Sequence, residues 1–462
     1  MEQADQFFSE MNKWIWGTPL LVLLLGTGAY LTFILRGMQF RYLGYAFKQV
    51  LAKQRKDSKG DISHFEALMT TLAGAIGTGT IVGVATAVSL GGLGALFWMW
   101  VTAFLGMATK YAESLLAVKY RQLDRKGEMS GGPMYYIEKG LGWKWLASLF
   151  AILGVIAALS TGNLVQTNSI AQAINHVWQI DPWLTGLILG AVTAVVIIGG
   201  VKSIGQVASI LVPLMAALYI AASLFILVVN FHRLPEAFGH IFYTAWNGQA
   251  ATGGILGTTM MMALQMGVAR SVFSNEAGLG ISSVAAAAAK TDNPGRQAMI
   301  TMTGALISTV IICTMTGLVL AVTDVIGTRS PSGELLNGAS LAIAAFNSHI
   351  IGGEYLVTIG LILFAYTTVL AWSYYGEKCV EYLVGERFIP AFRLLFACIV
   401  IPGAALKMEI AWHLADISNG LMAIPNLIAL IALSSVIVKE TKAFLNIVNE
   451  EKQLPVASLV VE

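Results

Sequence analysis

Two long apolar stretches of the chain are interrupted by glycine and polar residues that suit the binding of a small ligand. They run from Thr70 to Ala87 and from Gln265 to Ala289. A helix that breaks inside a membrane frees backbone N–H and C=O groups that lipid cannot satisfy, so a break persists only where it is buried or lines a cavity. The N–H groups that begin a half-helix attract an anion, and freed carbonyls attract a cation. We therefore expect the two breaks to form one binding site.

The first break is marked by glycines at positions 74, 77, 79 and 83, which do not share one helical face. Small residues also allow close helix packing, and Gly79 with Gly83 has the spacing for it. The alternative is that the helix unwinds near Thr78 to Thr80 and presents N–H groups to a carboxylate. The pattern leaves both interpretations open.

The second break contains two charges, Arg270 and Glu276, inside an apolar run. An ionisable residue at membrane depth is costly enough to be a functional hypothesis by default. The alternative is that the two charges pair with each other or satisfy backbone groups freed by the break. Ser274 and Asn275 are candidate caps for the half-helix that follows. Phe273 either packs in the core, as phenylalanine usually does in a helix, or covers a small ligand beside the break.

Two other apolar segments carry polar residues at helical spacing. Asn163, Gln166 and Thr167 share a face, which either lines the bundle interior or makes hydrogen bonds between helices. Thr367 and Thr368 provide two adjacent hydroxyls. Hydroxyl and carbonyl oxygens suit a hard cation such as Na⁺, whereas hydrogen bonding of threonine to its own helix is the simpler alternative.

The composition is that of a polytopic membrane protein. Of 462 residues, 56% are hydrophobic and 12% are charged, and the mean hydropathy is +0.71. Soluble domains are about 45–50% apolar and about 25% charged. The net charge of +2 gives no argument for nucleic acid as a partner. Three scattered cysteines fit buried thiols better than a disulfide framework or a metal site.

The sequence carries no motif for catalysis or nucleotide binding. A serine elbow, histidines at metal spacing, a P-loop and paired catalytic carboxylates are all missing. We therefore predict that the protein is not an enzyme and uses no organic cofactor. The rival classes are an intramembrane enzyme that uses Glu276 or Glu113, and a channel. A channel needs a continuous polar pore, whereas the polar residues here concentrate in a few patches.

About eleven segments are long and apolar enough to cross a membrane, at about 20 residues each. They are 14–36, 64–88, 95–118, 146–175, 183–200, 204–229, 252–289, 298–323, 352–380, 389–407 and 415–437. The segment 252–289 is too long for one regular span, as expected of a broken helix. Lysine and arginine gather in alternate loops, which predicts an external N-terminus and a cytoplasmic C-terminus.

The two broken helices begin two successive groups of five helices. We expect an extra N-terminal helix with a basic loop (1–62), a first five-helix repeat (63–230), a second repeat (231–438) and a cytoplasmic tail (439–462). Because five is odd, the second group starts on the opposite side of the membrane. The expected fold is therefore an all-α five-plus-five inverted repeat, as in secondary transporters.

Six motifs of the chain closely resemble the alanine or glycine:cation symporter family. They are GAIGTGTIVGVATA (74–87), GGLGALFWMWVTAFLG (91–106), SGGPMYYIEKGLG (130–142), GNLVQTNSIA (162–171), ARSVFSNEAGLG (269–280) and WSYYGEKC (372–379). The resemblance runs through nearly the whole chain. It implies a LeuT-like fold of the amino acid-polyamine-organocation superfamily and sodium-coupled uptake of small neutral amino acids.

The resemblance also implies which residues form the site. The substrate pocket would be formed by Ala75, Thr78, Gly79, Thr80, Gln166, Phe273, Ser274, Asn275, Gly278 and Trp372. The Na⁺ site would comprise carbonyls of Ala75, Thr78 and Phe364 and hydroxyls of Thr367 and Thr368. Thr80 departs from the asparagine that family members commonly carry in the motif GTGN. Threonine keeps a hydroxyl but loses the second hydrogen-bonding group of the amide.

These observations together predict a secondary symporter of a bacterial inner membrane. It would couple inward movement of Na⁺ to uptake of a small neutral amino acid, alanine or glycine, by alternating access. Its partners would be the amino acid, Na⁺ and the lipid bilayer. Glu276 makes a proton-coupled amino acid symporter the nearest alternative.

Overall fold

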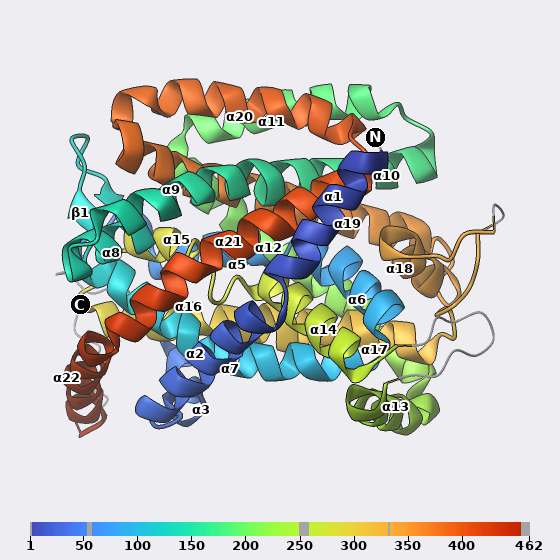
Figure 1. The fold of residues 1–462 in the computed structure, drawn as a ribbon, viewed down its shortest axis with the longest axis horizontal. Helices are drawn as coiled ribbons and strands as arrows, with labels where there is room; N and C mark the ends of the chain where they lie inside the picture. Colours follow the sequence, from blue (N-terminus) through green and yellow to red (C-terminus); the bar gives the residue numbers. More distant parts are fainter. Residues whose placement is uncertain (1, 53–57, 249–257, 331–332, 454–462) are drawn as a thin grey trace.

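The computed structural model describes residues 2–52, 58–248, 258–330 and 333–453, which form a mostly helical protein (Figure 1). The N-terminal part contains α1 (Glu2–Ile15), α2 (Thr18–Ile34), α3 (Met38–Arg41) and α4 (Leu43–Val50). The middle contains α7 (Gly94–Lys119), α8 (Pro133–Leu141), α9 (Lys144–Leu159), η2 (Ser160–Leu164), α10 (Val165–Trp178), α11 (Pro182–Ile198), α12 (Gly200–Val229), η3 (Phe231–Arg233) and α13 (Leu234–Asn247). The C-terminal part contains α16 (Pro294–Ala305), η4 (Leu306–Cys313), α17 (Thr314–Val322), α18 (Gly338–Asn347), α19 (Gly353–Val384), η5 (Glu386–Phe388), α20 (Ile389–Ala405), α21 (Met408–Ala432) and α22 (Ser434–Gln453).

The first interrupted segment is broken next to the glycines that predicted it. α5 (His64–Ala75) begins with a capping box made by Ser63 and Glu66. A π-helical turn, η1 (Gly79–Gly83), and α6 (Val84–Gly91) follow after residues 76–78. The two halves are bent by 50°. The break therefore falls slightly before the expected position, Thr78 to Thr80.

The second interrupted segment is broken over residues 276–282. α14 (Met260–Asn275) precedes this break and α15 (Ser283–Ala288) follows it. Glu276 has φ of 58°, a left-handed conformation that is uncommon for residues other than glycine. Gly278 and Gly280 also have positive φ, which glycine adopts without strain. Residues 252–257 of the expected span 252–289 lie outside the described residues.

Seven helical segments of the described residues are long and apolar enough to cross a membrane, or eight if the bent pair counts as one span. α7, α11 and α14 also coincide with expected spans, but α7 carries charged residues, α11 has only 17 residues, and α14 is broken. The number of eleven crossings therefore stays a prediction. α13 and α18 occupy connections where no helix was predicted.

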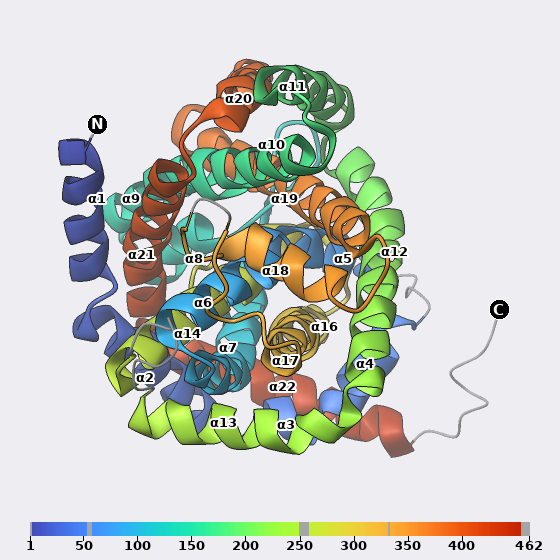
Figure 2. The same cartoon turned by 90° about the vertical axis from the view of Figure 1, so that its right-hand side faces the viewer.

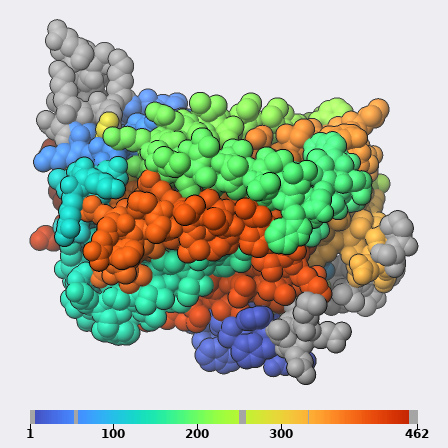
Figure 3. Space-filling view, turned by 90° about the horizontal axis from the view of Figure 1, so that it is seen from above, coloured from blue at the N-terminus to red at the C-terminus, as the bar shows by residue number. Residues whose placement is uncertain are grey.

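The broken helices lie inside the bundle. α7 packs against α14 and α16, and α19 packs against α5, α9 and α10. Figure 2 shows α5, α6 and α18 near the centre of the bundle, with α12, α13 and α21 around them. α11 and α20 pack together and cover an outer face, seen in green and orange in Figure 3. The freed backbone groups are thus surrounded by protein, as a break in a membrane helix requires.

A two-stranded hairpin, β1 (Gln122–Leu123) and β2 (Met129–Ser130), follows α7. Beside it, backbone pairing joins the two broken segments. The N–H of Lys290 donates to Ile62 O at 2.8 Å, and the N–H of Asp61 donates to Ala288 O at 2.8 Å. Arg121 donates to the carbonyls of Ala287 and Ala289 at 2.8 and 2.7 Å. The start of α5 is therefore tied to the end of α15.

Candidate functional site

The first break is held by Gln166 of α10. The backbone N–H of Thr78 donates to Gln166 Oε1 at 3.1 Å, and Gln166 Nε2 donates to Thr161 O at 3.0 Å. Gln166 thus satisfies one N–H at the start of the second half-helix and one carbonyl of η2. The hydroxyl of Thr78 is buried and has no hydrogen-bond partner among the described residues.

Thr80 stabilises the break from the other side. Its hydroxyl donates to Gly77 O at 2.8 Å, and its carbonyl accepts a hydrogen bond from Thr316 Oγ1 at 2.8 Å. Thr316 in turn lies 2.8 Å from the hydroxyl of Tyr219. In this conformation the Thr80 side chain therefore holds the unwound turn itself.

The second break differs from its sequence interpretation. Ser274 and Asn275 are the last residues of α14, so the prediction that they cap the next half-helix is wrong. Asn275 Nδ2 donates to Ser271 and to Thr309 at 3.1 and 3.2 Å. Ser274 lies 3.0 Å from the sulfur of Cys313. Asn275 Oδ1 instead accepts the N–H of Ala277 at 2.9 Å, where the chain leaves the helix.

Glu113 of α7 supports the glycines of the second break. Its Oε1 accepts the N–H groups of Gly278 and Gly280 at 2.9 and 3.1 Å. Asn426 of α21 donates to the same oxygen at 2.8 Å and to Gly278 O at 2.9 Å. Charge-assisted hydrogen bonds of this kind are stronger than neutral ones. Glu113 therefore positions the irregular segment, and Gly278 contributes backbone rather than side-chain contacts.

An aromatic layer covers the first break. A Cβ placed on Gly79 would lie 2.6 Å from a ring carbon of Phe273. The Phe273 ring stacks on Trp412, with centroids 4.9 Å apart, and the Arg270 guanidinium lies 4.6 Å from the Trp412 ring. Arg270 makes a bidentate pair with Asp416, at 3.0 and 2.6 Å. Arg270 therefore pairs with Asp416, and the interpretation that it pairs with Glu276 is wrong.

The N-terminal helix reaches this charged pair. Trp16, just after α1, donates its indole N–H to Asp416 O at 2.9 Å, and Asn12 donates to Asp416 Oδ2 at 3.4 Å. A cavity of about 80 Å³ lies between α1 and this pair, lined in part by Lys13, Gln265 and Arg270. α1 and the residue after it thus contribute polar groups beside the Arg270–Asp416 pair.

One of the two hydroxyls of α19 reaches a carbonyl of the first broken helix. Thr367 and Thr368 donate to Phe364 O at 3.0 and 3.1 Å, so both make the hydrogen bond to their own helix that the sequence left open as the simpler alternative. Thr368 also lies 2.7 Å from Ala73 O, and a Cβ on Gly77 would collide with its hydroxyl. Threonine, phenylalanine and alanine oxygens are thus gathered beside the break. The hydrogen bonds of the described residues link Thr368 to Ala73 and do not link it to Ala75 or Thr78.

Trp372 lies one turn further along α19. Its indole N–H donates to Gly74 O at 3.3 Å. A Cβ placed on Gly162 would collide with the Cβ of Trp372, so the glycine allows η2 to approach α19 closely. Trp372, Gln166 and the first break therefore share one buried region.

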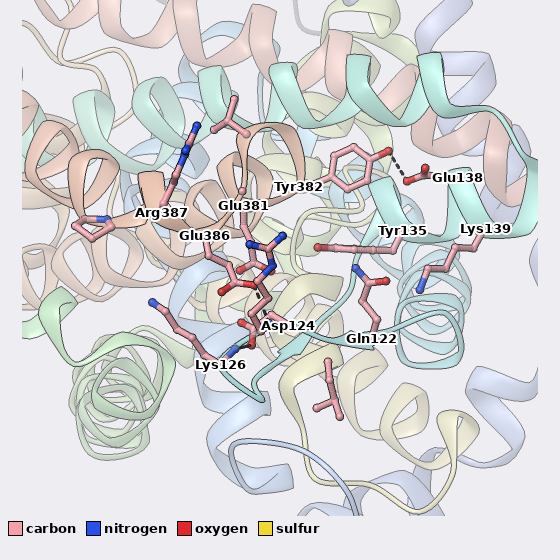
Figure 4. A pocket seen from close by; sticks show the side chains of 15 residues that line it. Gln122, Asp124, Lys126, Tyr135, Glu138, Lys139, Glu381, Tyr382, Glu386 and Arg387 are labelled. Atoms are coloured by element: carbon pink, nitrogen blue, oxygen red, sulfur yellow. Dashed lines mark hydrogen bonds between the residues drawn. The ribbon is translucent and has the colours of Figure 1, made fainter.

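A separate cavity of about 890 Å³ lies beside the β hairpin and the end of α19. Figure 4 shows acidic and basic side chains facing it, among them Asp124, Lys126, Glu381 and Arg387. Tyr382 donates to Glu138 across it at 2.7 Å. In the loop before α5, burial raises the pKa of Asp61, although the N–H of Met129 donates to its carboxylate and opposes that effect. Because both signs of charge are present, this cavity shows no preference for a charged ligand.

Comparison with known proteins decides the family. The sequence profile described as the sodium:alanine symporter family matches residues 1–458. The chain belongs to this family. The sodium/alanine symporter AgcS of Methanococcus maripaludis is 53% identical over 439 residues, which cover 94% of this chain and 96% of that one. The putative sodium/proton-dependent alanine carrier protein YrbD of Bacillus subtilis is 37% identical, with 93% and 90% of the two chains covered.

The fold agrees with that membership. The solved structure of MhsT in complex with L-phenylalanine matches with a TM-score of 0.58 at 13% identity, over 83% of this chain and 93% of that one. This neighbour is a LeuT-fold transporter, so the LeuT-like fold implied by the sequence is confirmed. The sodium:alanine symporter family is a family of transporters, and the chain is an integral membrane protein.

Three residues that contact α14 or the second break in this symporter-family chain were not predicted from the sequence. Lys110 of α7 donates its ammonium to Asn275 O at 2.5 Å. Its signal was an isolated charge in an apolar helix, the same signal that singled out Arg270. Asp416 carried no comparable signal because it lies at the start of the expected segment 415–437, and Asn426 carried none because it is a single uncharged residue within that segment.

The close approach at Gly79 leads to a first prediction. Gly79→Ala is expected to reduce amino acid uptake by about tenfold, which corresponds to about 1.4 kcal/mol, because its methyl group would displace the Phe273 ring. Gly83→Ala is the matched control on the same turn, since its Cβ would lie 3.6 Å from Cδ of Arg270, an ordinary van der Waals contact. Uptake into proteoliposomes, normalised to the amount of folded protein, measures both. Equal uptake by the two variants would contradict the role of Phe273 as the cover.

Proposed function

We propose that this protein couples inward movement of Na⁺ to uptake of a small neutral amino acid, alanine or glycine, by alternating access. The observation that carries the proposal is the position of the Thr368 hydroxyl, which lies 2.7 Å from Ala73 O on the first broken helix and 3.1 Å from Phe364 O on α19. Carbonyl and hydroxyl oxygens suit a hard cation, and the adjoining half-helix N–H groups suit a carboxylate. One broken helix thereby contributes to both sites.

The proposed sites use the residues expected from the family resemblance. The amino acid would contact Ala75, Thr78, Gly79, Thr80, Gln166, Phe273, Ser274, Asn275, Gly278 and Trp372. The Na⁺ ion would contact Ala75, Thr78, Phe364, Thr367 and Thr368. Binding of the ion next to Thr78 would order the turn whose N–H receives the carboxylate. Each ligand then favours binding of the other, as linkage requires.

The membrane arrangement belongs to the same proposal. The broken helices α5 to α6 and α14 to α15 would open two inverted five-helix repeats, residues 63–230 and 231–438. The N-terminus would be external and the tail cytoplasmic, in the inner membrane of a bacterium. Closure of the site under Phe273 on one side and the pairing of residues 59–62 with 288–291 on the other support an occluded state of such a cycle.

Proton coupling is the second candidate. It is favoured by the buried carboxylate of Glu276, and the relative YrbD bears the name of a putative sodium/proton-dependent alanine carrier. Both candidates are cation symport, so they differ in the ion rather than in the class of protein.

Uptake of labelled alanine into proteoliposomes tests the proposal. An inward Na⁺ gradient is expected to drive alanine above its equilibrium concentration, and gramicidin, which collapses the Na⁺ gradient, is expected to abolish the accumulation. Unlabelled glycine should compete, whereas leucine should not. Equilibration without accumulation would indicate a channel and would contradict symport. Accumulation driven by a pH gradient alone would replace Na⁺ by H⁺.

A further inference from the structure

Glu276 is a buried carboxylate that the proposed Na⁺ and amino acid sites do not use. The residue is 1% exposed. Neither of its carboxylate oxygens accepts a hydrogen bond from the described residues. An ionised carboxylate without hydrogen bonds or a counter-ion is strongly destabilising inside a protein. The side chain therefore needs a cation that neutralises it.

The ammonium of Lys110 does not form an ion pair with Glu276. Lys110 Nζ is bonded to the Asn275 carbonyl, and the ion pairs within 4.0 Å among the described residues do not join Lys110 to Glu276 or to Glu113. Glu113 differs from Glu276 in its hydrogen bonds, because one of its carboxylate oxygens accepts three of them. If both carboxylates are ionised, the one ammonium neutralises one of them and a negative charge is left in this buried group.

The carboxylate of Glu276 and the hydroxyl of Tyr375 both lie beside Gly74. A Cβ on Gly74 would lie 3.0 Å from Glu276 Oε1 and 2.9 Å from the hydroxyl of Tyr375. The Tyr375 hydroxyl is also 3.4 Å from Thr70 O, and Trp372 donates to Gly74 O. The titratable groups that face Glu276 are thus Lys110 on α7 and Tyr375 on α19, and Glu113 interacts with the same Lys110 ammonium. Carboxylate, phenol and carbonyl oxygens form a donor set for a small hard cation.

We propose that Glu276 is the acidic ligand of a second cation site, which binds one H⁺ or one Na⁺ during each transport cycle. This inference rests on the proposed function and adds an ion to it. The site lies between α5, α19 and the second break, whereas the first cation site lies at Thr367 and Thr368. A proton would bind one carboxylate oxygen and leave from it as H⁺; a sodium ion would enter and leave unchanged.

The position of the site gives the ion a role in coupling. Glu276 belongs to the second break, and it faces the last turn of α5 and the middle of α19. Separation of α5 from α19 would take Gly74 and Thr70 away from Trp372 and Tyr375. The donor set would then be lost and the ion released. Binding of this cation therefore favours the closed arrangement, and opening releases it.

The number of cations coupled to each alanine tests the proposal. In proteoliposomes with the membrane potential set by K⁺ and valinomycin, the potential at which net alanine flux is zero gives this number. The wild-type protein is expected to couple two cations per alanine, Glu276→Gln one, and Glu276→Asp two, because aspartate keeps the charge. Imposing only a Na⁺ gradient or only a pH gradient identifies which ion is lost in Glu276→Gln. An unchanged number in Glu276→Gln would overturn the proposal.

Two measurements keep the outcomes separable. Alanine counterflow without an ion gradient tests the proposed transport function, so its absence in the wild type refutes that function rather than the second site. If Glu276→Gln does not fold, Tyr375→Phe decides, since it removes a hydroxyl and keeps the ring. Tyr375→Phe is expected to raise the half-activating concentration of the second ion by about threefold to tenfold. An unchanged value in Tyr375→Phe, with the wild-type protein coupling only one cation per alanine, would contradict the site.

Discussion

Asp416→Ala is expected to be among the most destabilising single substitutions in this protein. It would leave the Arg270 guanidinium buried without its bidentate partner, whose two contacts are 3.0 and 2.6 Å long. The side chains of Arg270 and Asp416 are only 8% and 5% exposed. Removing one partner of a buried ion pair costs about 3–5 kcal/mol, because the other charge stays desolvated. A lower temperature at which half of the protein in detergent is inactivated by heating would measure this loss of stability.

The same helix provides a control for Asp416→Ala. Glu409 of α21 is exposed, so Glu409→Ala is expected to leave the inactivation temperature unchanged. The double variant Arg270→Met with Asp416→Leu removes both charges, and it should recover most of the stability. An inactivation temperature for Asp416→Ala equal to that of Glu409→Ala would show that Arg270 has another charge partner.

The Arg270–Asp416 pair is also connected to the aromatic layer that covers the first break. Asp416 orients Arg270, whose guanidinium lies on the Trp412 ring, and Trp412 stacks on Phe273 above Gly79. Cation and ring attract each other most where water is excluded. Loss of Asp416 therefore loosens the whole layer and not only one contact. Higher rates of alanine release in Asp416→Ala proteoliposomes would accompany the lower stability.

The position of the first break could be predicted because glycine and polar residues interrupt an apolar run there. The sequence located the second break in the correct segment, but it did not predict the boundaries of that break. α14 continues through Ser274 and Asn275 because their side chains find partners on α14 and η4. The helix stops at Glu276, whose left-handed conformation has no local sequence signal, since glutamate rarely adopts it.

Partners of charged residues were the least predictable part of the site. Arg270 and Asp416 are separated by 146 positions, and Glu113 reaches Gly278 over 165. Such pairs depend on how helices pack, whereas the apolar pattern reports only that each helix is buried. The resemblance to the family supplied Gln166 and Trp372 as lining residues. It did not show that Gln166 already bonds the N–H of Thr78.

Thr368→Ala is expected to weaken sodium activation by tenfold or more while the protein still folds. The Thr368 hydroxyl lies 2.7 Å from Ala73 O on α5 and 3.1 Å from Phe364 O on α19, so it is at the junction of the two helices. In the proposed site it provides one of two hydroxyl ligands. A loss of about 1.4 kcal/mol of Na⁺ binding free energy with this ligand raises the half-activating Na⁺ concentration about tenfold. Initial rates of alanine uptake over a range of Na⁺ concentrations measure this value.

Two variants of α19 separate ion binding from packing. Thr368→Ser keeps the hydroxyl and is expected to retain most of the sodium affinity. Thr358→Ala removes a buried hydroxyl that has no hydrogen-bond partner among the described residues, so it should leave sodium activation unchanged. If Thr368→Ala instead activates at the wild-type Na⁺ concentration while the total amount of folded protein falls, Thr368 only joins α5 to α19. The cation would then have to bind elsewhere, and the carboxylate of Glu276 would be the remaining acidic ligand at the broken helices.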